Sequence, residues 1–74
     1  MILKDPIGTR ETIEKKRGWN TIEEIAAKLD IASNTVGRAF RGEPVRLATI
    51  RKLAQAIDMG ASEIAVVVPR ENRV

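Results

Sequence analysis

Apolar residues recur every three or four positions along most of the chain, a spacing that predicts short amphipathic helices. The clearest case lies between residues 21 and 29, where Thr21 and Glu24 form a capping pair that opens a helix. One face of this helix then carries the apolar residues Ile22, Ile25, Ala26 and Leu29. Asp30 is expected to end the helix, because aspartate tolerates the left-handed backbone of a tight turn better than most residues.

A first helix is expected ahead of this segment. Asp5 and Pro6 are typical of a helix start, with aspartate as the cap and proline at the first helical position. The helix is expected to run to Arg17, and its apolar stripe is thin, with only Ile7 and Ile13.

Two more helices are expected after the turn at Asp30. Residues 33–41 place Val36 and Phe40 four apart on a buried stripe, and Gly42 follows as a C-terminal cap. Residues 47–58 form the next helix, and five of its apolar residues are expected to face inward: Leu47, Ile50, Leu53, Ala54 and Ile57.

The last part of the chain predicts a short fifth helix over residues 61–65, followed by three valines ahead of Pro69. Because β-branched residues favour extended backbone, residues 66–74 are expected to be an extended segment and a loose tail. This run has two interpretations, since it can fold back on its own domain or pair with a second copy of the chain. We favour the second, with dimer contacts from Ile64, Val66, Val67 and Val68.

Together these elements predict an all-α fold, a single domain over residues 1–74. It is expected to be a compact bundle of four to five short helices with a central helix-turn-helix and a short C-terminal extended strand. A chain of this size buries only about 60% of the surface that its unfolded form exposes, which leaves little room for a deep catalytic cleft.

Composition narrows the classes of function. The chain contains no cysteine and no histidine, so it lacks thiolate chemistry, the commonest general base and the commonest zinc ligand. We therefore expect no enzyme activity, no metal site and no cofactor. The longest apolar run, residues 64–68, is far shorter than the roughly 20 residues that span a bilayer, and the opening residues lack the apolar core of a signal peptide. A cytoplasmic protein, in a bacterium or a phage-infected host cell, is expected.

Positive charge is concentrated in one part of the sequence. The formal net charge is +3, but residues 33–52 alone carry five basic residues and one acidic residue. A clustered positive field is the electrostatic footprint of a protein that binds polyanions, although a solvated helix face has the same composition.

The exposed side of the helix at residues 33–41 combines basic residues of this window with polar residues that can form hydrogen bonds. The positions that the apolar stripe leaves free are Ser33, Asn34, Gly37, Arg38 and Arg41. The major groove of B-DNA admits one helix, and there asparagine can pair with adenine and arginine with guanine. A glycine inside a helix costs about 1 kcal/mol relative to alanine, so Gly37 indicates a close approach of the backbone to DNA or to another helix.

The segment TIEEIAAKLDIASNTVGRAFRG, followed by TIRKLAQAI, resembles the lambda-repressor/Cro-like (Xre-type) helix-turn-helix family over residues 7–64. The resemblance implies a bundle that binds operator DNA, usually as a dimer, with its third helix in the major groove. It assigns base reading to Ser33, Asn34 and Arg38, with Thr35 and Gly37 close by. It assigns phosphate contacts to Thr21, Ile22, Arg41, Val45 and Arg46.

The chain departs from this family at three positions. Ile22 stands where the family often has glutamine, Asp30 where it usually has glycine, and Ala32 where it often has serine or threonine. Ala32 leaves the helix at residues 33–41 without its usual cap, so Ser33 can be drawn into capping.

The function expected from these features is sequence-specific binding of double-stranded DNA by a transcriptional regulator. The resemblance favours a phage-type repressor that occupies an operator as a homodimer, and no small-molecule ligand is evident. The alternative is a protein-interaction module on the same scaffold, such as an antitoxin or an adaptor, whose apolar tail docks a partner.

Overall fold

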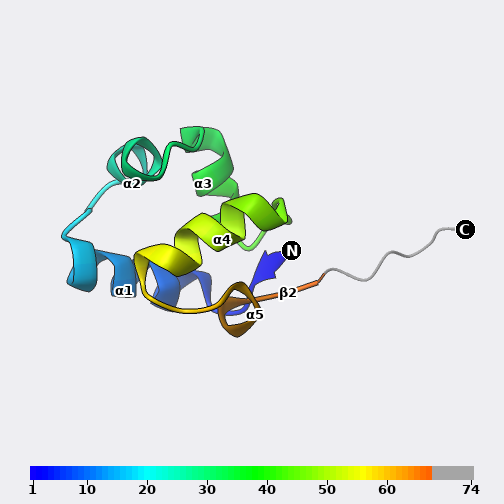
Figure 1. The fold of residues 1–74 in the computed structure, drawn as a ribbon. Helices are drawn as coiled ribbons and strands as arrows, with labels where there is room; N and C mark the ends of the chain where they lie inside the picture. The colour runs from blue at the N-terminus through cyan, green and yellow to red at the C-terminus, as the bar shows by residue number, and fades with distance from the viewer. Residues whose placement is uncertain (68–74) are drawn as a thin grey trace, which may run out of the picture.

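The computed structural model describes residues 1–67, and it confirms the expected compact, mostly helical fold (Figure 1). The elements in chain order are β1 (Ile2–Leu3), α1 (Pro6–Arg17), α2 (Ile22–Leu29), α3 (Ser33–Phe40), α4 (Leu47–Ala56), α5 (Ala61–Ile64) and β2 (Ala65–Val66). Helix α4 crosses the middle of the bundle, with α2 and α3 on one side and α1 and α5 on the other (Figure 1).

The first two helices begin at the caps that the sequence predicted. The Asp5 carboxylate accepts a hydrogen bond from the Gly8 backbone N–H at 3.1 Å. The Thr21 hydroxyl accepts one from the Glu24 N–H at 3.0 Å, and the Glu24 carboxylate in turn accepts one from the Asn20 N–H at 3.0 Å. These bonds satisfy backbone donors that a helix start otherwise leaves unpaired, and so they fix where α1 and α2 begin.

The four longer helices are followed by residues with left-handed backbone. These are Gly18, Asp30, Gly42 and Asp58, with φ angles of 74°, 57°, 79° and 57°. Such a residue reverses the chain and lets the next N–H groups bond to the last free carbonyls of the helix. Helix α4 therefore ends at Ala56, two residues before Asp58, and the predicted extension of this helix to residue 58 is wrong.

The turn between α2 and α3 is held at both ends. The Ile31 N–H donates to the Ala26 carbonyl at 2.9 Å, which closes the end of α2. The Lys52 ammonium group reaches from α4 and donates to the Asp30 carbonyl at 3.2 Å. The two helices are thereby joined by a three-residue turn that α4 supports.

The core consists mainly of residues from the four longer helices, together with Leu3 of β1, Ile64 of α5 and Ala65 of β2. The largest fully buried side chains are Ile13, Ile25, Val36, Ile50 and Leu53. Burial of one such side chain is worth about 1.5–3 kcal/mol, so these five residues supply much of the stabilisation that a small domain can obtain.

Three residues of the predicted apolar stripes, Ile22, Leu29 and Phe40, are only partly buried against this core, and two more are exposed. Ile7 is 72% exposed and Leu47 is 42% exposed. Ile13 lies six positions after Ile7, which places the two side chains about 120° apart around a helix, and buried Thr9 takes the inward position instead. Leu47 is the first residue of α4 and lies at the edge of the bundle.

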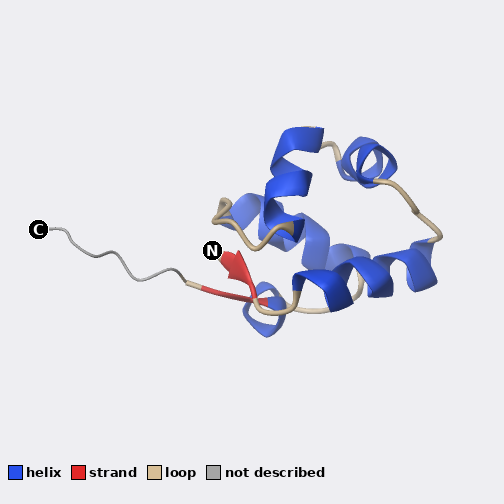
Figure 2. Ribbon diagram, turned by 180° about the vertical axis from the view of Figure 1, so that it is seen from behind, coloured by secondary structure: helices blue, strands red, loops and turns tan. Residues whose placement is uncertain are grey.

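The two short strands join the ends of the described chain. β1 pairs antiparallel with β2, with Ile2 opposite Val66 and Leu3 opposite Ala65 (Figure 2). β1 was not expected from the sequence. The segment after α5 therefore folds back, at least through Val66, on its own chain.

This pairing bears on the expected dimer contacts. Ile64 is only 5% exposed and belongs to the core of its own chain, so its side chain does not face outward. Val66 and Val67 are 49% and 75% exposed. Val68 and the rest of the expected tail lie outside the described residues.

The two isoleucines of α1 give a matched test of the core. Ile13→Ala should lower the free energy of unfolding by about 2–5 kcal/mol, because it leaves a cavity in a fully buried site. Ile7→Ala removes the same atoms from an exposed position and should change it by no more than about 0.5 kcal/mol. Urea denaturation followed by circular dichroism measures both, and similar losses in the two variants would contradict this register of α1.

Candidate nucleic-acid interface

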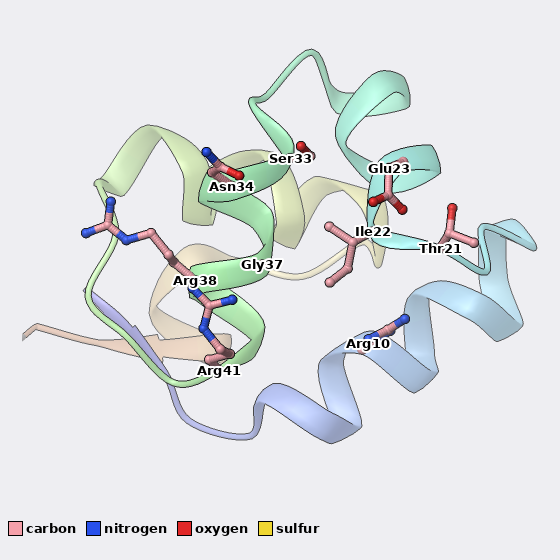
Figure 3. Close-up of a pocket in the computed structure, with 9 residues that line it drawn as sticks. All are labelled: Arg10, Thr21, Ile22, Glu23, Ser33, Asn34, Gly37, Arg38 and Arg41. Carbon is pink, nitrogen blue, oxygen red and sulfur yellow. The ribbon is translucent and has the colours of Figure 1, made fainter.

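Helix α3 is buried on one side and free on the other. Val36 and Ala39 are fully buried in the core, whereas Ser33, Asn34 and Arg38 are exposed. Because residues three and four apart share one side of a helix, this short helix can be anchored by two side chains and still present a continuous polar face. Figure 3 shows this face.

A groove with a volume of about 670 Å³ runs beside that face, and we call it the α2–α3 groove. Helix α3 forms one wall, and the start of α2 together with one residue of α1 forms the other (Figure 3). Its lining residues are Arg10, Thr21, Ile22, Glu23, Ser33, Asn34, Gly37, Arg38 and Arg41. The groove is therefore mainly polar, with three arginines and one glutamate.

A second groove, with a volume of about 470 Å³, lies on the opposite flank of α3, and we call it the α3–α4 groove. It is lined by Ile31, Thr35, Arg38, Pro44, Val45, Arg46 and Thr49. Only Arg38 lines both grooves. Helix α3 is thus a ridge between two depressions, with Arg38 on its crest.

The residues singled out in the sequence are distributed between these two grooves. The base-reading candidates Ser33, Asn34 and Gly37 share the α2–α3 groove with three of the phosphate-contacting candidates: Thr21, Ile22 and Arg41. Thr35 is half-buried and faces the α3–α4 groove, where the other two phosphate-contacting candidates lie, Val45 and Arg46. Of the dimer candidates, Ile64, Val66 and Val67 line neither groove, and β2 lies beside α5 on the other side of α4 (Figure 1).

Gly37 lies at the floor of the α2–α3 groove. A Cβ atom added there would be 3.4 Å from the Arg41 Nη1 atom and 4.0 Å from the Ile22 Cδ1 atom. Both are ordinary van der Waals distances, so the packing of α3 against α2 does not require a glycine. The absence of a side chain instead keeps the groove deep between Ile22 and Arg41.

The start of α2 offers hydrogen-bond donors to this groove. The N–H groups of Ile22 and Glu23 lie in the first turn, where an α-helix has no carbonyl partner for them. The Thr21 hydroxyl accepts the bond from Glu24, so its own hydrogen is still available for donation. A helix start with free N–H groups favours anions, although the Glu23 carboxylate at the same end opposes them.

The arginines at the end of α3 are not free cations. Arg41 Nε donates to a carboxylate oxygen of Glu43 at 2.9 Å, and Arg38 Nε lies 3.5 Å from the other oxygen. The hydrogen bond from Arg41 lowers the pKa of Glu43 below its ordinary value, and the positive charges of Arg41 and Arg38 lower it further. Partial desolvation acts in the opposite direction and is outweighed. Glu43 is therefore ionised at neutral pH.

Sequence reasoning missed three residues of this surface: Arg10, Glu23 as a lining residue, and Glu43. Arg10 extends from α1 with its guanidinium 6.0 Å from the centre of the Phe40 ring, a cation–π distance. The apolar pattern of α1 is too thin to say which way Arg10 points. Glu43 had a signal, since it is the only acidic residue in the basic window of residues 33–52.

Other kinds of site are not evident in the part of the chain that the structure describes. No group of three or more potential metal-ligating side chains occurs within residues 1–67. In the same range, no helix combines the length and the apolar character that crossing a bilayer requires.

Comparisons of the chain with models of protein families, with curated proteins and with solved structures find no match. These comparisons therefore assign the chain to no family.

The ion pairs of Glu43 can be tested directly by its titration. We expect its pKa below the ordinary 4.5, and Arg41→Ala should raise it toward that value. Because the pKa is lowered in the folded state, the stability from these contacts is present above the unfolded-state pKa and is lost as the pH falls through the lowered value. NMR titration of the side-chain carboxyl carbon measures the pKa. Arg46→Ala, which removes a charge that makes no ion pair with Glu43, serves as the control; identical titrations in wild type and Arg41→Ala would refute the assignment.

Proposed function

We propose that the protein binds double-stranded DNA in a sequence-specific way and regulates transcription by occupying an operator. The observation that carries this proposal is the exposed face of α3, a polar ridge with Ser33, Asn34 and Arg38 between two grooves. An α-helix with its side chains is about 10–12 Å across, and the major groove of B-DNA is about 12 Å wide. The resemblance of residues 7–64 to repressors of the lambda and Cro type supports the same reading.

The ridge carries side chains whose chemistry matches base edges. Ser33 and Asn34 lie in the first turn of α3, and Arg38 lies one turn further on. The Asn34 amide can pair with the N6 and N7 atoms of adenine, and the Arg38 guanidinium with the O6 and N7 atoms of guanine. The Ser33 hydroxyl can donate or accept toward several bases, so it adds less to the choice of sequence.

The two grooves have the features that phosphate contacts need. In the α2–α3 groove, the Thr21 hydroxyl and the N–H groups of Ile22 and Glu23 can donate to one strand of the duplex. In the α3–α4 groove, Arg46 precedes the first turn of α4 and lies beside its free N–H groups. A duplex that straddles α3 would place one sugar–phosphate strand against each groove, and these contacts would set the register of α3 on the bases.

A repressor of this type would act as a homodimer on two half-sites related by symmetry. Val66 and Val67 are exposed apolar residues at the end of the described chain and are the candidates for the contact between copies. Two α3 helices would then lie about one DNA turn apart, and the bound protein would block polymerase.

The proposal is tested by selecting bound duplexes from a random pool and measuring the mass of the complex. Enrichment of one sequence with two symmetric half-sites, bound by two chains, would support both the site and the dimer. Enrichment of a single half-site bound by one chain would remove the dimer and keep the DNA-binding function. No enrichment over the starting pool would contradict the function.

Arg38 should determine the base choice at one position of the selected site. Arg38→Ala should weaken binding to the selected duplex by about 1–3 kcal/mol and relax the preference at that position, because a bidentate contact with guanine is lost. Arg41→Ala should instead weaken all sequences alike and flatten the dependence on salt. Fluorescence titration against the selected duplex and its single-base variants measures both, and equal losses on every duplex for Arg38→Ala would remove it from base reading.

Substitution of Gly37 by alanine should change the stability of the protein and its binding to DNA in opposite directions. Gly37→Ala should raise the free energy of unfolding by about 0.5–1 kcal/mol, since alanine is the better helix former and the new methyl group has room. The same methyl group would fill the floor of the α2–α3 groove and should weaken binding to the selected duplex about tenfold, or about 1.4 kcal/mol. Thermal unfolding and the same titration measure the two effects; unchanged affinity would mean that DNA does not approach this part of the backbone.

A further inference from the structure

Glu43 is placed by the backbone at the end of α3. The Gly42 φ angle of 79° turns the chain back on the helix, and the Gly42 N–H donates to the Ala39 carbonyl at 3.1 Å. The next N–H, of Glu43, donates to the Arg38 carbonyl at 3.0 Å. This pair of bonds is a common way to close a helix, and it fixes the Glu43 backbone beside the last turn of α3.

From that position the Glu43 carboxylate contacts the Nε atoms of both Arg38 and Arg41. One oxygen accepts from Arg41 Nε at 2.9 Å, and the other lies 3.5 Å from Arg38 Nε. A guanidinium has five N–H donors, and four of them are on the two terminal nitrogens. Both arginines therefore keep their terminal N–H groups, while the hydrogen bond at Nε restricts the direction of the Arg41 guanidinium and the longer ion pair restricts that of Arg38 less.

The carboxylate also changes the electrostatics of the ridge. Two arginines and one glutamate carry a net charge of +1 in place of +2, and the Glu43 side chain is 45% exposed at this end of α3. A phosphate group near this end would be attracted by two cations and repelled by one anion. The edge of a guanine carries no net charge, so it can accept from Arg38 without the same repulsion.

We propose that Glu43 is a specificity-determining residue of the DNA site, which orients Arg38 and Arg41 through their Nε atoms and weakens, without abolishing, the attraction of both arginines to phosphate groups in general. This inference rests on the proposed DNA-binding function. Its consequence is that Glu43 lowers binding to arbitrary DNA more than binding to the operator, and so raises the ratio between the two.

The test compares Glu43→Gln with Glu14→Gln. The first keeps the shape of the side chain and removes its charge beside the arginines. The second makes the same change of net charge on the exposed surface of α1, where Glu14 forms no ion pair with the arginines of α3. Each protein is titrated with the selected duplex and with a scrambled duplex of equal length, at several salt concentrations. Thermal unfolding of both variants verifies that they are folded.

Glu43→Gln should raise the affinity for the scrambled duplex about five- to tenfold near 0.1 M salt, and it should steepen the salt dependence by about 0.9, as one additional phosphate contact would. Affinity for the selected duplex should rise less or fall, so the ratio of the two affinities should decrease about fivefold or more. Glu14→Gln should leave the ratio unchanged. An unchanged ratio in Glu43→Gln, or equal changes in the two variants, would overturn the proposal.

Two further readings separate this inference from the function on which it rests. If the wild-type protein does not distinguish the two duplexes, the proposed function fails, and the role of Glu43 fails with it. If the wild type distinguishes them and Glu43→Gln does so equally well, only the role of Glu43 fails. In the absence of DNA, the Nε–H resonances of Arg38 and Arg41 should shift in Glu43→Gln and not in Glu14→Gln; resonances that do not move would overturn the geometry itself.

Discussion

The burial of Val36 and Ala39 in the core is the contact on which the surface chemistry of this protein depends. Helix α3 has eight residues, and a helix of that length is not stable alone in water. It exists because these two side chains are fully buried, together with Ile25 of α2 and Ile50 of α4. The same packing leaves the other side of α3 uncovered. The short turn at Asp30 places α2 beside α3, where the start of α2 forms the far wall of a groove and does not cover the polar face. The polar ridge is therefore exposed because α3 packs on the core through Val36 and Ala39, on its opposite side.

The left-handed residues after the helices determine where the remaining elements lie. Asp30 turns α3 across α2, and Gly42 turns the chain back along α3 before α4 begins. Without the turn at Gly42, Glu43 would continue away from the helix and would not contact the arginines of α3. The contacts of Glu43 with the two arginines therefore depend on the backbone conformation of Gly42.

Much of this architecture could be predicted from the sequence because its signals are local. Thr21, Asp5 and Gly42 act within a few residues of themselves, so the starts of α1 and α2 and the end of α3 followed from residue type. The exposed face of α3 followed from the position of Val36 in a helical repeat. Each of these inferences needed only the geometry of one helix.

The features that could not be predicted involve partners distant in the sequence. β1 is two residues long and has no pattern of its own, and its pairing with β2 joins residues more than sixty positions apart, although the valines at the end of β2 did favour extended backbone. Arg10 reaches the α2–α3 groove only because α1 packs beneath α3, which the thin apolar stripe of α1 did not specify. The inward assignment of Ile7 failed for the same reason, since a stripe of two residues does not fix the register of a helix.

The charge of residues 33–52 illustrates why a count of basic residues is an incomplete guide to binding. Of its five basic side chains, Arg38 and Arg41 contact the only acidic residue in the window, and Lys52 donates to the Asp30 carbonyl. Arg46 and Arg51 form no ion pair within residues 1–67, and Arg46 lines the α3–α4 groove. An uncompensated charge therefore lies in that groove and not on the crest of α3. In the proposed complex, Arg46 would then add to the general attraction to phosphates, while Arg38 on the crest would contribute mainly through base edges. A regulator that must find one site among many needs this separation, because attraction to every phosphate raises affinity for all DNA alike.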